Sequence, residues 1–86
     1  MIPPKLTGFT VYTKTGCRYC ELVKELLQHE SPLLIDADPY LAADRDAFLA
    51  FITAQGGKGH KTFPMVFLNG VFVGGFTETY AMLNQV

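Results

Sequence analysis

The chain has 86 residues, of which 49% are hydrophobic, and a formal net charge of −1 at pH 7. A chain of this length buries roughly 60% of the surface that it exposes when unfolded, so we expect one modest core and a single domain over residues 1–86. A net charge so close to zero gives no general attraction to nucleic acid or to a membrane surface, and no stretch approaches the ~20 apolar residues of a membrane span. We expect neither kind of partner.

The two cysteines of the chain stand three residues apart, at Cys17 and Cys20. Residues 1–5 (MIPPK) lack the apolar segment of a secretion signal. Close cysteines without such a signal indicate a reducing compartment, where they are more often catalytic or metal-binding than structural. We therefore expect a cytoplasmic protein.

The first half of the chain predicts two strands joined by a helix. Aromatic and β-branched residues predict a short buried strand over residues 9–12. Apolar residues at helical spacing predict a helix from Cys17 to about His29, which Ser31-Pro32 ends. A second apolar run over residues 33–36 predicts the next strand, with Asp38-Pro39 as the turn after it.

A second helix is predicted from about Tyr40 to Gln55, with Gly56-Gly57 at its end. Asn69-Gly70 separates two apolar runs, residues 65–68 and 71–73, which is the strongest local signal of a β-hairpin.

Gly74-Gly75 precedes a short last helix, for which Thr77 is the expected cap and Tyr80 and Leu83 the expected inner face. The predicted order is β-α-β-α-β-β-α. Two strands joined by a helix should be parallel with a right-handed crossover, and the hairpin adds two antiparallel strands. We expect an α/β protein of thioredoxin-like fold, with a four-stranded mixed sheet and flanking helices.

Cys17 and Cys20 lie where a strand gives way to a helix, an arrangement suited to thiol–disulfide exchange. The unpaired N–H groups and partial positive charge of a helix N-terminus favour the thiolate at the first cysteine, and the thiolate is the nucleophile. The second cysteine, one turn along, lies on the same face and can close a disulfide. A purely structural role is disfavoured because the loop between the two is very short.

Basic residues stand in two places near these motifs. Lys14 and Arg18 flank the first cysteine, and Lys58, His60 and Lys61 precede Thr62. If the two groups meet in space they form a local anion site; otherwise they are solvated surface charges. The two readings stay open at this point.

Zinc is disfavoured as a ligand of the cysteines together with His29 and His60. His29 lies at the far end of the same predicted helix as Cys20, about 13 Å along it at 1.5 Å per residue. A tetrahedral site needs ligands that converge, so we expect no metal.

Three motifs along nearly the whole chain resemble those of a glutaredoxin. The segment Tyr12 to Cys20 (YTKTGCRYC) is similar to the strand, lysine and Cys-Pro-Tyr-Cys active site of the family. Thr62-Phe63-Pro64 resembles the Thr-Val-Pro element before the third strand, and residues 74–78 (GGFTE) are similar to the Gly-Gly-x-acidic segment after the fourth. The resemblance implies a cis peptide bond before Pro64.

The resemblance implies a glutathione-dependent thiol–disulfide oxidoreductase with glutathione as co-substrate. Cys17 would be the nucleophile and Cys20 the resolving thiol. The residues implied in glutathione binding come from all three motifs: Lys14, Tyr19, Lys61, Thr62, Phe63, Pro64, Gly75, Phe76, Thr77 and Glu78. In the family the backbone before the proline pairs with the cysteinyl part of glutathione, the last helix receives the γ-glutamyl carboxylate, and basic residues meet the glycyl carboxylate.

The implied partners are glutathione and proteins that carry disulfides or bound glutathione, with ribonucleotide reductase among the possible acceptors of electrons, and we expect a monomer. Two alternatives stay open: a redoxin reduced by thioredoxin reductase, and a dimeric module holding an iron–sulfur cluster with Cys17 and glutathione. The retained Cys20 departs from the monothiol class tied to such clusters.

Three residues depart from the family pattern. Arg18 replaces the usual proline between the cysteines, and its charge should keep the Cys17 thiolate at least as stable as in the proline form. Phe63 is larger than the common valine and should narrow the groove. Thr77 stands where an acidic residue is common, which weakens the expectation for γ-glutamyl recognition.

Overall fold

The computed structural model describes residues 1–85, so Val86, the last residue of the predicted domain, lies outside the described part. The elements follow one another in the predicted order: β1 (Phe9–Thr13), α1 (Arg18–Leu26), β2 (Leu33–Asp36), α2 (Asp38–Ile52), β3 (Met65–Leu68), β4 (Val71–Gly74) and α3 (Phe76–Leu83). A short π-helical turn, η1 (Thr53–Gly57), extends α2.

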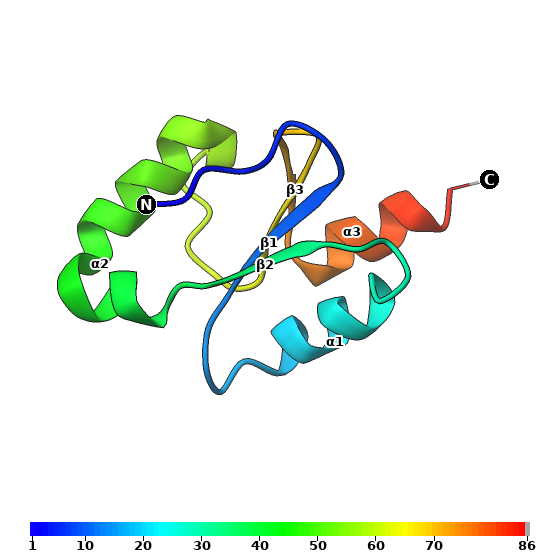
Figure 1. Cartoon of the computed structure of the whole chain (residues 1–86), viewed down its shortest axis with the longest axis horizontal. Coiled ribbons are helices and arrows are strands. Elements are labelled where there is room, and N and C mark those ends of the chain that lie inside the picture. The colour runs from blue at the N-terminus through cyan, green and yellow to red at the C-terminus, as the bar shows by residue number, and fades with distance from the viewer. Residues whose placement is uncertain (86) are drawn as a thin grey trace.

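The strands form one mixed sheet in the order β2-β1-β3-β4. β1 runs parallel to β2 and antiparallel to β3, and β3 pairs with β4 as an antiparallel hairpin. α2 lies on one side of this sheet, and α1 and α3 lie side by side on the other (Figure 1). The predicted four-stranded sheet with helices on both faces is confirmed.

Side chains of the two central strands alternate between two cores. Tyr12 and Phe67 face α2, where Phe48 lies 5.9 Å from Tyr12 between ring centroids. Val11 and Val66 face α1 and α3. All of these side chains are fully buried, as expected for central strands with helices on both faces.

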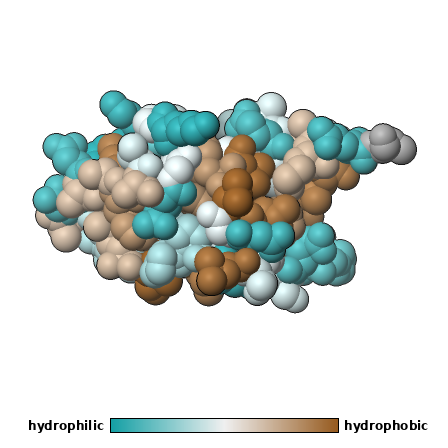
Figure 2. Space-filling model, turned by 90° about the horizontal axis from the view of Figure 1, so that it is seen from above, coloured by the Kyte–Doolittle hydropathy of each residue, from teal (hydrophilic) through white to brown (hydrophobic). Residues whose placement is uncertain are grey.

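The outer surface mixes hydrophobic and hydrophilic side chains. Figure 2 shows hydrophobic atoms reaching the surface in several separate places on the face it presents. Within residues 1–85, no helix combines the length and the apolar character that crossing a bilayer requires.

The predicted ends of the first two helices were wrong by several residues. α1 ends at Leu26 rather than near His29, because Leu27 leaves the helical conformation (φ −99°, ψ 11°) while its side chain stays fully buried. α2 begins at Asp38, so Asp38-Pro39 is its first turn and not a separate loop. Proline is favoured there because the first turn of a helix needs no backbone N–H donor.

α2 also contains an interruption that the apolar pattern does not reveal. Asp44 has extended backbone angles (φ −165°, ψ 95°) inside the helix. Its Oδ1 accepts a hydrogen bond of 3.0 Å from the Ala47 N–H, which is the contact of a helix N-cap. Asp44 therefore ends one helical segment and caps the next.

The hairpin prediction is confirmed, with Asn69 (φ 52°) and Gly70 (φ 81°) in its turn. The predictions for α3 were wrong in detail: Gly75, not Thr77, is its N-cap residue. Thr79 is the residue of α3 that is fully buried, whereas Tyr80 and Leu83 are 51% and 38% exposed. The face that turns inward carries Phe76, Thr79 and Met82.

Candidate active site

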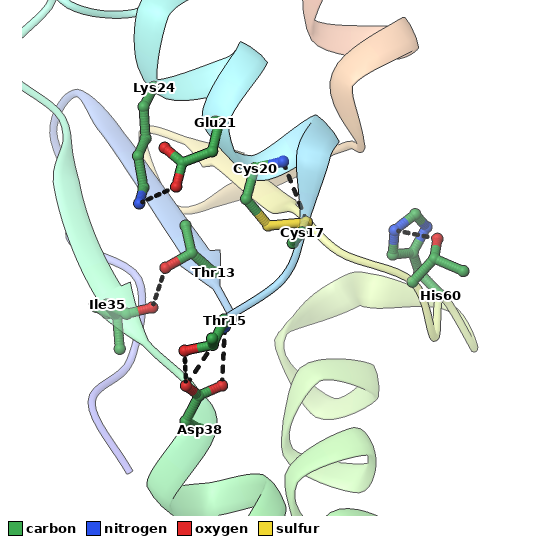
Figure 3. Close-up of a disulfide and its surroundings, with 10 residues drawn as sticks. Thr13, Thr15, Cys17, Cys20, Glu21, Lys24, Ile35, Asp38 and His60 are labelled. Atoms are coloured by element: carbon green, nitrogen blue, oxygen red, sulfur yellow. Dashed lines mark hydrogen bonds and ion pairs between the residues drawn. A yellow bond between two sulfur atoms is a disulfide. The ribbon is translucent and has the colours of Figure 1, made fainter.

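Cys17 is the N-cap residue of α1 and forms a disulfide with Cys20, with 5.2 Å between the two Cα atoms. The Cys17 Sγ accepts a hydrogen bond of 3.1 Å from the Cys20 N–H. Gly16, at φ +71°, makes the turn that leads into this position, a conformation that glycine adopts without steric cost. Figure 3 shows the disulfide at the start of α1.

The two cysteines differ in their access to solvent. Cys17 is half-buried, whereas Cys20 is only 1% exposed. An attacking sulfur has to reach its substrate, and a helix N-terminus stabilises it as thiolate. The geometry therefore suits Cys17 to nucleophilic attack and Cys20 to resolution within the chain.

The loop before Cys17 is tied to the start of α2. The Asp38 carboxylate accepts a hydrogen bond of 3.0 Å from the Thr15 N–H and a second bond from the Thr15 hydroxyl. Asp36 Oδ1 accepts the Asp38 N–H at 2.9 Å. The hydrogen bonds from Thr15, followed by the nearby charge of Lys14, hold the pKa of Asp38 below its usual value. Figure 3 shows Thr15 turned toward Asp38.

A groove of about 340 Å³ lies beside the start of α1. It brings together eight residues of the sequence-predicted glutathione site: Tyr19, residues 62–64 and residues 75–78. The Tyr19 ring contacts Phe76, with 5.9 Å between centroids, so the first turns of α1 and α3 meet at one wall of the groove. The Phe63–Pro64 peptide bond is cis, as the resemblance implied.

The two predicted lysines do not line this groove. Lys14 is exposed, and its Nζ lies over the Phe63 ring, 5.8 Å from the centroid. Lys61 is exposed and is absent from the groove lining. The basic side chain that does line the groove is His60. Sequence analysis did not select it, although it stands two residues before Thr62 in the basic cluster.

The N-terminus of α3 lines the groove. Gly74 has φ +135°, and a Cβ there would lie 2.7 Å from Glu78 Oε1, so this position requires glycine. Glu78 Oε1 accepts the Gly75 N–H at 2.8 Å and so caps the helix. The N–H groups of Phe76 and Thr77, in the first turn, have no acceptor within an α-helix. An anion in the groove can receive these N–H groups.

Residues 1–85 contain no group of three or more His, Cys, Asp and Glu side chains placed to hold a metal ion.

The glutaredoxin family model matches residues 9–73 of the chain. The chain belongs to the glutaredoxin family. A glutaredoxin of Neisseria meningitidis serogroup A is 32% identical over 81 residues, which cover 88% of this chain and 85% of that protein. Human mitochondrial glutaredoxin-2 is 29% identical over 76 residues, covering 84% of this chain and 43% of the human protein.

Solved glutaredoxin structures share the fold. The solution structure of a Brucella melitensis glutaredoxin is 32% identical, with a TM-score of 0.65, and the match covers 96% of this chain and 85% of that one. A buckwheat glutaredoxin–glutathione complex is 28% identical, with a TM-score of 0.70, over 88% of this chain and 67% of that one. The thioredoxin-like fold is thereby confirmed.

Family membership and the Cys17–Cys20 pair together make this glutaredoxin a thiol–disulfide oxidoreductase. The resemblance found in the sequence is confirmed as to family. The assignment of individual groove residues to glutathione remains a prediction.

Proposed function

We propose that the chain is a glutathione-dependent oxidoreductase, which reduces protein–glutathione mixed disulfides and protein disulfides. The observation that carries this proposal is the position of the accessible Cys17 at the start of α1, two residues before Tyr19, which forms one wall of the groove. A thiol peptide in that groove would present its sulfur to Cys17. The buckwheat relative that was solved as a glutathione complex supports this reading.

The groove offers groups for both parts of the peptide. The α3 N–H groups of Phe76 and Thr77 would receive the γ-glutamyl carboxylate, and the backbone of Phe63 would pair with the cysteinyl unit. Lys14 and Lys61, which lie outside the groove lining, could meet the glycyl carboxylate only if it extends beyond the lining residues.

The reaction with a mixed disulfide proceeds by two exchanges. The Cys17 thiolate attacks the glutathione sulfur, the protein–glutathione S–S bond breaks, and the protein thiolate leaves and takes a proton. A second glutathione thiolate then attacks the sulfur of the bound glutathione. Oxidised glutathione is released and Cys17 returns as thiolate. Each mixed disulfide therefore consumes one free glutathione, and the other half of the oxidised glutathione comes from the substrate.

A protein disulfide requires Cys20. Cys17 attacks one sulfur of the substrate and forms a mixed disulfide, and the Cys20 thiolate then displaces the substrate as a dithiol. The disulfide between Cys17 and Cys20 is the product of that step, and two glutathione molecules reduce it.

We further propose that the protein acts as a cytoplasmic monomer without a metal, and that ribonucleotide reductase is one disulfide protein it serves.

A mixed-disulfide reduction assay on three proteins tests this proposal. We expect wild type to turn over a glutathione mixed disulfide, Cys17→Ser to be inactive, and Cys20→Ser to keep this activity while losing reduction of protein disulfides. The Cys20→Ser variant serves as the matched control because it removes one sulfur from the same helix turn.

Equal loss in both variants would contradict the two roles. Activity with thioredoxin reductase but none with glutathione would favour the redoxin alternative. Visible absorbance of anaerobically purified protein would favour the iron–sulfur alternative.

A further inference from the structure

Few side chains in the lining of the groove beside Cys17 are acidic or basic. The lining contains one basic side chain, His60, and one acidic side chain, Glu78, and neither Lys14 nor Lys61 belongs to it. Glu78 Oε1 is already engaged with the Gly75 N–H. His60 is therefore the side chain of this lining that can offer a positive charge to an anion in the groove.

His60 is held in place by contacts from three sides. Its ring meets the Phe72 ring of β4 edge-on, with 5.1 Å between centroids. Its Nε2 lies 3.4 Å from the Thr62 Oγ1, and its Cε1 lies 3.8 Å from the position that a Cβ would take on Gly75. The ring is half-buried and lines the groove beside Gly75, the N-cap residue of α3. Figure 3 shows His60 apart from the Thr15–Asp38 contact.

We propose that His60 is a specificity-determining residue for glutathione, whose imidazolium form binds a carboxylate of the peptide at the N-terminus of α3. This proposal rests on the proposed function. Histidine is the side chain whose ordinary pKa lies between pH 5 and 8, so its charge changes in the working range. A protonated ring adds a charge-assisted hydrogen bond to those of the first-turn N–H groups.

The charged neighbours of His60 define what else could produce a pH effect. Lys58 and Lys61 flank it on its own loop, Glu78 faces the groove from α3, and the element β4 contributes the uncharged Phe72. The thiols of α1 would also titrate in the reduced protein. An experiment on the oxidised protein removes this contribution because the Cys17–Cys20 disulfide does not titrate.

The test is binding of S-methylglutathione to the oxidised protein, measured by calorimetry at pH 5.5 and pH 8.0. We expect wild type to bind about fivefold more tightly at pH 5.5, the size expected of a half-exposed ion pair. His60→Gln should bind S-methylglutathione with the same affinity at both pH values. That affinity should equal the weaker one of wild type at pH 8.0. His60→Arg should bind tightly at both. His29→Gln is the matched control and should keep the wild-type ratio.

Proton NMR of His60 in wild type gives a second readout that needs no variant. Saturating S-methylglutathione should raise the pH midpoint of the His60 Cε1–H resonance and leave that of His29 unchanged. Equal affinity at both pH values, or an unmoved His60 midpoint, would overturn the role of His60 and leave the proposed function standing. No binding at either pH would overturn the groove as a glutathione site, and the role of His60 with it.

Discussion

Thr15 and Asp38 fix the backbone just before the reactive cysteine. The N–H and the hydroxyl of Thr15 both donate hydrogen bonds to the Asp38 carboxylate, and Asp36 Oδ1 accepts the backbone N–H of Asp38. Because the carboxylate form accepts these bonds, the pKa of Asp38 is lowered in the folded protein. A lowered pKa means stability that is present above the unfolded value, roughly pH 4, and is lost as pH falls through the folded value.

Asp38→Asn should therefore reduce the loss of stability in acid. We expect the urea midpoint of wild type to fall more steeply than that of the variant as pH decreases from 5 to 2.5, because only wild type has this carboxylate to protonate. Urea unfolding followed by circular dichroism at a series of pH values measures it. Asp46→Asn, on the exposed surface of α2, is the control, and identical acid profiles for Asp38→Asn and wild type would contradict the prediction.

At the scale of single residues, the sequence predicted which residues are reactive better than it predicted which surface each side chain contacts. Cys17, Cys20 and the eight groove residues stand in short motifs whose backbone conformation is local, so their position follows from the motif. Lys14 and Lys61 have long flexible side chains, and their charge alone does not say which surface they will face. The shorter side chain of His60 enters the groove because Phe72, far along the chain, packs against it.

At the scale of the element, α2 consists of two helical segments with Asp44 between them. The side chain of Asp44 satisfies the Ala47 N–H, one of the donors that a helix start leaves unpaired. Asp44→Ala should destabilise the protein by about 1 kcal/mol, the usual cost of removing an N-cap side chain. Urea unfolding measures this loss. Asp46→Ala, on the same helix, should have a much smaller effect, and equal effects of the two variants would argue against capping.

The identity of each element could be predicted, but several of their ends could not. The Asn69-Gly70 turn was recognised because its two residues need positive φ, which few other residues accept. Leu41 before Asp44 and Phe48 and Ile52 after it pack into the same core, so the apolar pattern of α2 does not reveal the interruption. Gly75 is the N-cap residue of α3 because Glu78 accepts its N–H, and Thr77, which was predicted as the cap, lies inside the first turn.

At the scale of the whole molecule, the α2 core and the groove share an aromatic contact. Phe48 is fully buried, and its ring is stacked with Phe63 of the groove at 6.0 Å between centroids and 13° between planes. Phe63 therefore holds its position in part through a residue that never touches solvent. The packing of the core on this side should influence binding in the groove.

Phe48→Leu tests this connection. We expect a loss of roughly 1–3 kcal/mol in the free energy of unfolding, because the smaller side chain leaves space in the core and removes ring contacts, together with a severalfold higher KM for the mixed disulfide. Phe9→Leu is the matched control, because Phe9 belongs to the core on the other face of the sheet. Urea unfolding measures the change in the free energy of unfolding, and steady-state kinetics measures the change in KM. An unchanged KM in Phe48→Leu would show that Phe63 is positioned without its partner.

The side chain that caps α1 is the sulfur of Cys17, which is also one atom of the disulfide. The chemistry of the site and the stability of the helix start therefore depend on the same atom. An ionised sulfur accepts the Cys20 N–H more strongly than a sulfur bonded to another sulfur does. Reduction of the disulfide to two thiols therefore strengthens the hydrogen bond at the first turn of α1. By thermodynamic linkage, any change that stabilises this turn more in the reduced protein favours the dithiol over the disulfide. Substitutions along this turn would adjust the readiness of the pair to accept electrons without touching either cysteine.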